Sequence, residues 1–142
     1  MTLECLHLAG ASYSHHTQCL IEDSPTNRAA LVEIMTLVGT RYDMSDRTAQ
    51  WREEMVRFSA PIRHDTNDDI VSFVTTNRDT QAAGIRLDGY MSEGKLIGEV
   101  GQVRWSKKRS ESYIAIHESL VAEFRRRFGD SVIFDEADHL LP

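Results

Sequence analysis

The spacing of apolar positions along the chain predicts three amphipathic helices. The pair Ser24-Pro25 suits a helix start, because Ser caps the first turn and Pro loses no hydrogen bond there. Apolar residues then recur at helical spacing as far as Gly39, where we expect a left-handed C-terminal cap. A second helix is predicted from Ser45 to Ala60, just before a proline. A third is predicted from Ser110 to Phe128, with one apolar face made of Tyr113, Ile116, Leu120, Phe124 and Phe128.

Alternation with a period of two predicts a β-hairpin in the last third of the chain. Its strands run from Ala83 to Met91 and from Leu96 to Trp105, joined by a turn at 92–95. In the return strand, Gly98 and Gly101 indicate a bulge or the close approach of another backbone. A polar loop is expected at residues 10–18. Further short strands are expected at 3–9, 19–21, 70–75 and 131–134.

These elements predict an α+β fold, with an antiparallel β-sheet of four to six strands and three helices packed mainly on one face. A chain of 142 residues fits a single domain, 1–142, and a domain of that size buries roughly 70% of its unfolded surface. Cys5 and Cys19 lack C-x-x-C spacing, so we expect buried or free thiols, with a disulfide as the open alternative. Neither a signal peptide nor a membrane-spanning run is visible, and a soluble, cytoplasmic protein is expected.

The charge balance decides which partners the chain is expected to bind. A formal net charge of -6 argues against a nucleic-acid-binding surface, which needs clustered Lys and Arg. We expect the acidic groups to face a protein partner with a basic surface instead. The predicted binding residues are Asp65, Asp68, Asp69, Asp135, Glu136 and Asp138. The interpretation from sequence is therefore a non-enzymatic binding protein of the inhibitor, immunity or phage counter-defence type. No cofactor is expected, and no metal-ligand spacing is present.

Two histidine motifs support an enzymatic alternative. His15-His16-Thr17 and His64-Asp65-Thr66 both have the form His-x-Thr. The pattern resembles that of the two-histidine phosphoesterases, which implies catalytic roles for His15, Thr17, His64 and Thr66. In that family one imidazole acts as base and the other as acid, while the hydroxyls hold the phosphate. The chain departs from the family at the middle position of each motif, which is usually hydrophobic.

Two further resemblances concern cofactor binding. The order of the predicted elements is similar to the first part of the GNAT acyltransferase fold, which implies coenzyme A as cofactor. That family's glycine pattern falls at 106–112, where this chain has no glycine. The string 132–139 resembles the Asp-Glu-Ala-Asp motif of helicases. Because no phosphate-binding G-x-x-x-x-G-K-[ST] loop precedes it, we do not expect ATPase activity.

Overall fold

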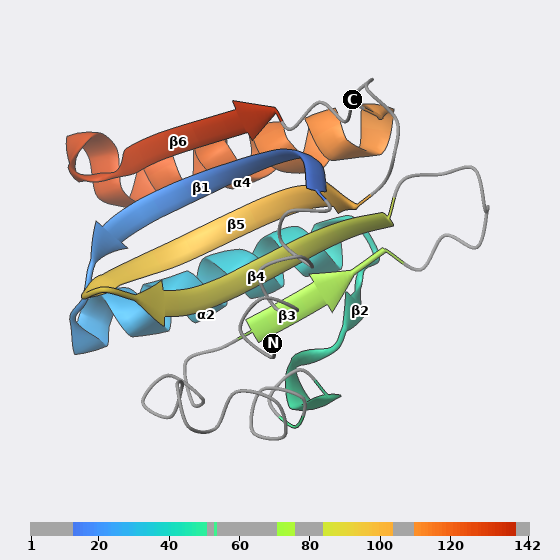
Figure 1. The fold of residues 1–142 in the computed structure, drawn as a ribbon. Helices are drawn as coiled ribbons and strands as arrows, with labels where there is room; N and C mark the ends of the chain where they lie inside the picture. Colours follow the sequence, from blue (N-terminus) through green and yellow to red (C-terminus); the bar gives the residue numbers. More distant parts are fainter. Residues whose placement is uncertain (1–12, 51–52, 54–70, 76–83, 104–109, 139–142) are drawn as a thin grey trace, which may run out of the picture.

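The structure is a computed structural model that describes residues 13–50, 53, 71–75, 84–103 and 110–138. In these residues a six-stranded antiparallel sheet has two long helices packed against one face (Figure 1). The elements are β1 (Tyr13–Glu22), α2 (Pro25–Arg41), β2 (Ser45–Asp46), β3 (Val71–Val74), β4 (Gly84–Ser92), β5 (Lys95–Val103), α4 (Glu111–Phe128), the 3₁₀ turn η1 (Gly129–Ser131) and β6 (Ile133–Asp138). Another helical segment begins at Thr48, and the structure describes residues 48–50 and 53 of it. The predicted α+β class is confirmed.

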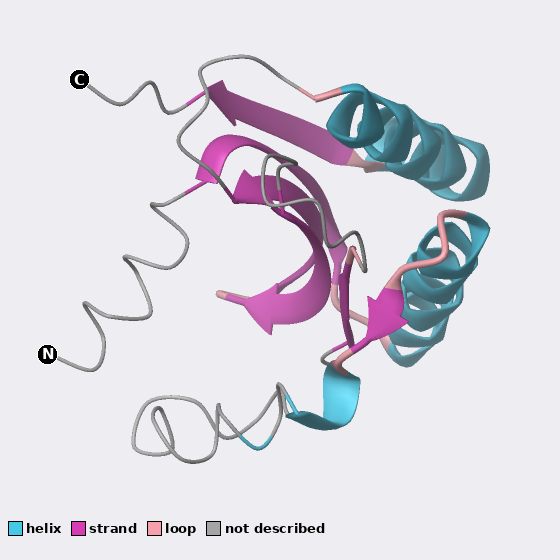
Figure 2. Ribbon diagram, turned by 90° about the vertical axis from the view of Figure 1, so that its right-hand side faces the viewer, coloured by secondary structure: helices cyan, strands magenta, loops and turns pink. Residues whose placement is uncertain are grey.

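The strand order is β2-β3-β4-β5-β1-β6. Strands β1 and β4 are parallel to each other, since each pairs antiparallel with β5 between them. Helix α2 leads from β1 towards β4, and α4 leads from β5 to β6. This is the split β-α-β of ferredoxin-like folds, with β3 and β2 added beyond β4. Both helices pack on the same side, and the sheet bends so that the face away from α2 and α4 is the inner one (Figure 2).

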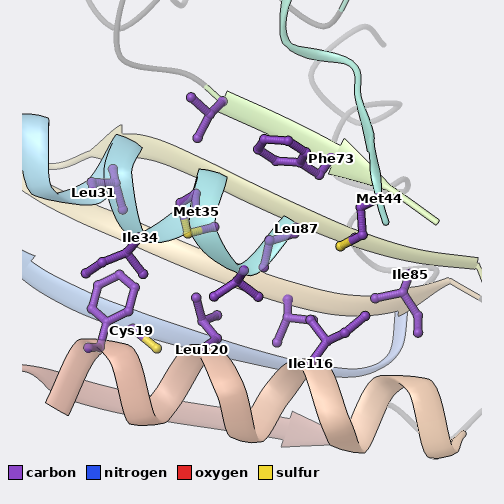
Figure 3. Close-up of a cluster of buried hydrophobic side chains, with 14 of the residues drawn as sticks. Cys19, Leu31, Ile34, Met35, Met44, Phe73, Ile85, Leu87, Ile116 and Leu120 are labelled. Atoms are coloured by element: carbon purple, nitrogen blue, oxygen red, sulfur yellow. The ribbon is translucent and has the colours of Figure 1, made fainter. Parts of the chain in front are cut away.

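The core lies between the two helices and the sheet (Figure 3). Each helix begins where the sequence predicts, with the hydroxyl of Ser24 or Ser110 accepting a hydrogen bond of 3.0 Å from a first-turn amide. Phe124 is completely buried, as the predicted apolar face of the last helix requires. The largest fully buried side chains are Leu31, Met35, Ile85, Leu87, Leu96, Tyr113, Ile116, Leu120 and Phe124.

Two glycines allow helices and sheet to approach closely. A Cβ on Gly98 of β5 would lie 2.6 Å from Cζ of Phe124, so this glycine makes room for a side chain and not for the other backbone that the sequence predicted. A Cβ on Gly39 would lie 2.7 Å from Cδ2 of Phe73. The predicted C-terminal cap at Gly39 is wrong, because α2 continues to Arg41 and buries Gly39 against β3. Glycine is therefore needed at position 39 because a side chain there would collide with Phe73, and not because the backbone is left-handed.

Three predicted boundaries are corrected by strand pairing. Residues 13–22 form one strand, rather than a polar loop followed by a short strand, because β1 pairs with both β5 and β6. Residues 133–138 form β6, which begins and ends later than the strand predicted at 131–134, because it pairs with β1 as far as Asp138. Ser45 does not start a helix, since Ser45 and Asp46 pair with β3. The predicted strand at 3–9 and most of the predicted helix at 45–60 lie outside the described residues.

Candidate functional site

The face of the sheet away from α2 and α4 carries a transverse row of polar side chains. In register, Ser72 of β3 lies opposite Asp88 of β4, and Asp88 lies opposite Glu99 of β5. Glu99 in turn lies opposite Gln18 of β1, which lies opposite Asp135 of β6. We call these five residues the polar row. Alternate residues of these strands, such as Cys19, Leu87 and Val100, are buried in the core, so the polar row faces away from the helices.

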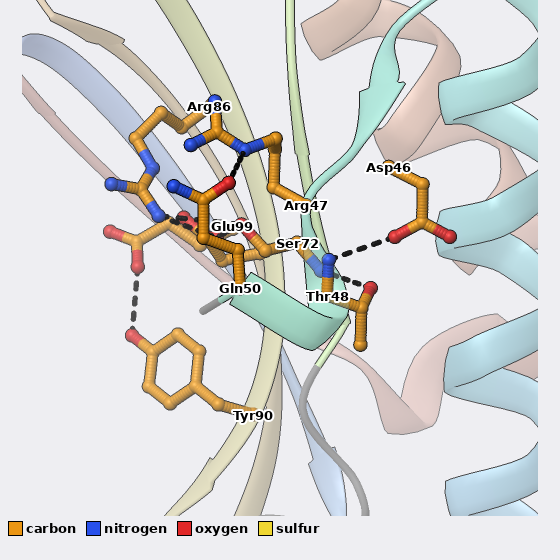
Figure 4. A network of polar contacts seen from close by, with 9 residues as sticks. Asp46, Arg47, Thr48, Gln50, Ser72, Arg86, Tyr90 and Glu99 are labelled. Atoms are coloured by element: carbon orange, nitrogen blue, oxygen red, sulfur yellow. Dashed lines mark hydrogen bonds and ion pairs between the residues drawn. The ribbon is translucent and has the colours of Figure 1, made fainter. Parts of the chain in front are cut away.

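Hydrogen bonds join the polar row to two neighbours on β4, Arg86 and Tyr90 (Figure 4). The hydroxyl of Ser72 donates to Oδ1 of Asp88 over 2.6 Å, and Nη2 of Arg86 lies 3.4 Å from the same oxygen. The hydroxyl of Tyr90 donates to Oε1 of Glu99 over 2.8 Å and accepts from Nε2 of Gln18 over 3.2 Å. The guanidinium of Arg86 therefore lies next to the carboxylate of Asp88, while the carboxyl group of Glu99 accepts its hydrogen bond from the neutral phenol of Tyr90.

This arrangement changes the proton affinity of Glu99. Burial raises its pKa from 4.5 to about 7, and the charge of Asp88 acts in the same direction. The hydrogen bond from Tyr90 and the charge of Arg86 act in the opposite direction but do not cancel the effect. Burial, together with the charge of Glu99, also raises the pKa of Tyr90 above its ordinary range. Glu99 consequently exchanges its proton near neutral pH, whereas Tyr90 keeps its proton and remains a donor.

A second polar cluster lies on the other side of the sheet, where β1 faces α4. Oγ1 of Thr17 is 2.9 Å from Nδ1 of His117 and 3.2 Å from the hydroxyl of Tyr113, both on α4. Nε2 of His117 lies 3.3 Å from Oε1 of Glu136 on β6. The ring of His15 lies 6.0 Å from that of Tyr113. The imidazole of His117 therefore connects α4 both to Thr17 on β1 and to Glu136 on β6.

The residues predicted for phosphoester chemistry are only partly tested by this geometry. His15 and Thr17 lie on β1 rather than in a loop, and their exposed fractions are 3% and 1%. Thr17 is engaged by Tyr113 and His117, so its hydroxyl is not directed at solvent. His64 and Thr66 lie outside the described residues, so their pairing with His15 and Thr17 stays a prediction.

The predicted acidic residues do not share one face. Asp135 and Glu136 are both exposed, but they are consecutive on β6 and therefore point to opposite sides of the sheet. Asp135 ends the polar row, whereas Glu136 contacts His117 on the helix side. Asp138 belongs to the same strand. Asp65, Asp68 and Asp69 lie outside the described residues.

Sequence reasoning missed Asp88, Glu99, Tyr90 and His117. Asp88 and Tyr90 were visible only as the polar positions of an alternating strand, and no motif marked them. Their meeting with Glu99 depends on the register between β4 and β5, which the turn at Glu93 and Gly94 closes with two residues of positive φ. With the turn placed there, counting back along both strands would have paired Asp88 with Glu99.

No protein family model matches the chain, and no curated protein matches it significantly. Among the helices that the structure describes, none is long and apolar enough to cross a membrane. Over the same residues, no group of three or more His, Cys, Asp or Glu side chains is arranged to hold a metal ion.

Proposed function

We propose that the face of the sheet away from α2 and α4 binds a small molecule and that Glu99 exchanges a proton with it. The observation that supports this proposal is the placement of Asp88 and Glu99 directly opposite each other on neighbouring strands. Cβ atoms of such a pair are about 4.5–5.5 Å apart, and like charges at this separation destabilise the sheet. A carboxyl group kept protonated near neutral pH by burial and a like charge is typical of acid–base sites.

The free energy of folding favours a functional origin for this pair. A glutamine at position 99 would keep the hydrogen bond from Tyr90 without the repulsion from Asp88. The carboxylate costs stability above its pKa of about 7, because burial and the charge of Asp88 outweigh the hydrogen bond from Tyr90 and the charge of Arg86. A residue that destabilises the fold where a neutral isostere would serve is expected where the proton itself is used.

The surroundings of Glu99 indicate what the ligand would look like. Next to the polar row, towards the β4–β5 turn, Tyr90, Ile97, Leu20 and Ile133 lie opposite one another on successive strands. Leu20 is partly exposed and Ile133 is 58% exposed. We therefore expect an amphipathic ligand, with an apolar part against Leu20 and Ile133 and a group of pKa near 7 at Glu99.

The proposal is tested by NMR on protein labelled with carboxyl-¹³C glutamate. The resonance that disappears in Glu99→Gln should titrate with a midpoint near pH 7. A fragment library screened at pH 6 and pH 8 should then give binders that shift Tyr90 and Glu99 and that lose affinity in Glu99→Gln. Glu118→Gln, an exposed position on α4, is the matched control. A midpoint near 4.5, the ordinary pKa of Glu, would contradict the proposal, as would binders that cluster elsewhere.

Binding of a protein partner is a second candidate function, and the exposed outer strand β6 favours it. The sequence interpretation as an inhibitor, immunity or counter-defence protein stays a prediction within that candidate. The polar row and the outer strand are different surfaces, so the two functions are tested separately.

A further inference from the structure

The two edges of the sheet differ in what they offer a partner. Strand β2 has only two residues and leads into the helical segment at Thr48. There the backbone amide of Thr48 donates a hydrogen bond to Oδ1 of Asp46. Strand β6 has six residues and, within the described part of the chain, pairs with β1 on one side only. The main chain of an outer strand offers alternate N–H and C=O groups to an added strand. The longer edge is therefore the one suited to strand addition (Figure 1).

The side chains of β6 determine which strand could be added. Asp135 and Glu136 are exposed, and Ile133 is 58% exposed. The ring of Phe134 is covered by the guanidinium of Arg125, 4.8 Å from the ring centre, so among residues 133–136 the open apolar side chain is that of Ile133. A second copy of this chain would bring one acidic strand against another. Like charges facing each other across a strand pair are destabilising, so the acidic side chains oppose self-association.

We propose that β6 binds an extended, basic segment of a partner protein as a seventh strand. The main chain of the segment pairs with the outward side of β6. Lysine or arginine lies opposite Asp135 and Glu136, and an apolar residue lies opposite Ile133. Asp135 is expected to contribute more than Glu136, because Glu136 already lies 3.3 Å from Nε2 of His117. This inference does not depend on the ligand site at Glu99. It identifies β6 as the surface for the second candidate function, the binding of a protein partner.

The test uses capped hexapeptides and uniformly ¹⁵N-labelled full chain. The first peptide has two adjacent lysines flanked by valines, the second has glutamates in place of the lysines, and the third is the basic peptide with alternate amides methylated. We expect only the basic, unmethylated peptide to shift β6 resonances and to slow amide exchange on its outward side. Methylation keeps the charge but removes the donors, so it separates strand addition from general attraction. The affinity should fall as salt rises, because the charges are exposed.

Two charge reversals complete the test. Asp135→Lys should weaken binding of the basic peptide about tenfold, because an attraction across the strand pair becomes a repulsion. Asp130→Lys changes the net charge equally but lies on η1, outside β6, and should change the affinity less than twofold. Equal weakening by both variants, or unchanged binding of the methylated peptide, would overturn the inference in favour of general electrostatic attraction. Shifts confined to Tyr90 and Glu99, dimerisation through β6, or no binding of the basic peptide would overturn it as well.

Discussion

Replacing Glu99 by glutamine should make the protein more stable at pH 8, although it removes a partly buried group that makes a hydrogen bond. Glutamine resembles the protonated carboxyl group, since its Oε1 still accepts from Tyr90 and its amide can donate where the carboxyl proton did. It cannot ionise, so it does not repel Asp88. The expected gain in stability is therefore a direct consequence of the raised pKa of Glu99.

The magnitude follows from the difference between the two pKa values. In the unfolded chain Glu99 loses its proton near pH 4.5, and in the folded protein near pH 7. Between these values the folded state binds more protons, so the contribution of Glu99 to the free energy of unfolding falls as pH rises. A tenfold change in proton affinity corresponds to about 1.4 kcal/mol, which gives a loss of at most about 3–4 kcal/mol above pH 7. Below about pH 4.5 wild type and variant should be equally stable.

The assay is urea denaturation at intervals from pH 4 to pH 8.5, followed by circular dichroism and analysed as the difference between Glu99→Gln and wild type. Taking the difference cancels the titration of all other groups, provided that they behave alike in both proteins. The difference should be small at pH 4 and should rise through pH 7 in favour of the variant. Glu118→Gln should give a flat difference. A flat curve for Glu99→Gln, or a variant less stable at pH 8, would refute the reasoning about Asp88 and burial.

Four other substitutions or reactions test the packing. Phe124→Ala should lower the free energy of unfolding by about 3–5 kcal/mol in urea denaturation, because a fully buried ring leaves a cavity. Gly98→Ala should lower it by about 1–3 kcal/mol, since the added methyl group meets the same ring; an unchanged value would show that the ring moves aside. Burial raises the pKa of the Cys19 thiol to about 12. Iodoacetamide should therefore alkylate Cys19 only when the protein unfolds, which mass spectrometry can follow. His15→Ala should cost about 1–3 kcal/mol, because His15 is buried beside Tyr113; no cost would restore the predicted loop.

The fold was predictable where a local pattern agreed with packing. The two long helices have Ser caps and apolar stripes, and the β4–β5 hairpin alternates around a tight turn, so each was recognised within a few residues. Strand β1 was not recognised at its beginning, because its inward positions include His15 and Thr17, which read as loop residues. Their polar groups are accommodated by contacts with α4, a feature of tertiary structure that no local pattern reveals.

The candidate site was not predictable from motifs, because its members come from different strands and are joined only by register. Ser72, Asp88, Glu99, Gln18 and Asp135 are scattered between positions 18 and 135 of the sequence. A shift of one residue between β4 and β5 would place Asp88 and Glu99 on opposite faces. Only Asp135 was predicted as a binding residue, on the basis of charge alone.

The polar row places the two proposed surfaces on one line, and the spacing of strands indicates how strongly they can affect each other. Neighbouring strands are about 4.8 Å apart, so Asp88 is one spacing from Glu99, whereas Asp135 is two spacings away, beyond Gln18. Asp135 is also exposed, so water and salt screen its charge far more than that of the buried Asp88. A basic strand on β6 that neutralises Asp135 should therefore lower the pKa of Glu99 only slightly. Replacement of Asp88 by asparagine should lower it more, although burial remains the largest cause of the raised value. Proton exchange at Glu99 and strand addition at β6 are thus nearly independent properties of one sheet, and each proposal stands or fails by its own measurement.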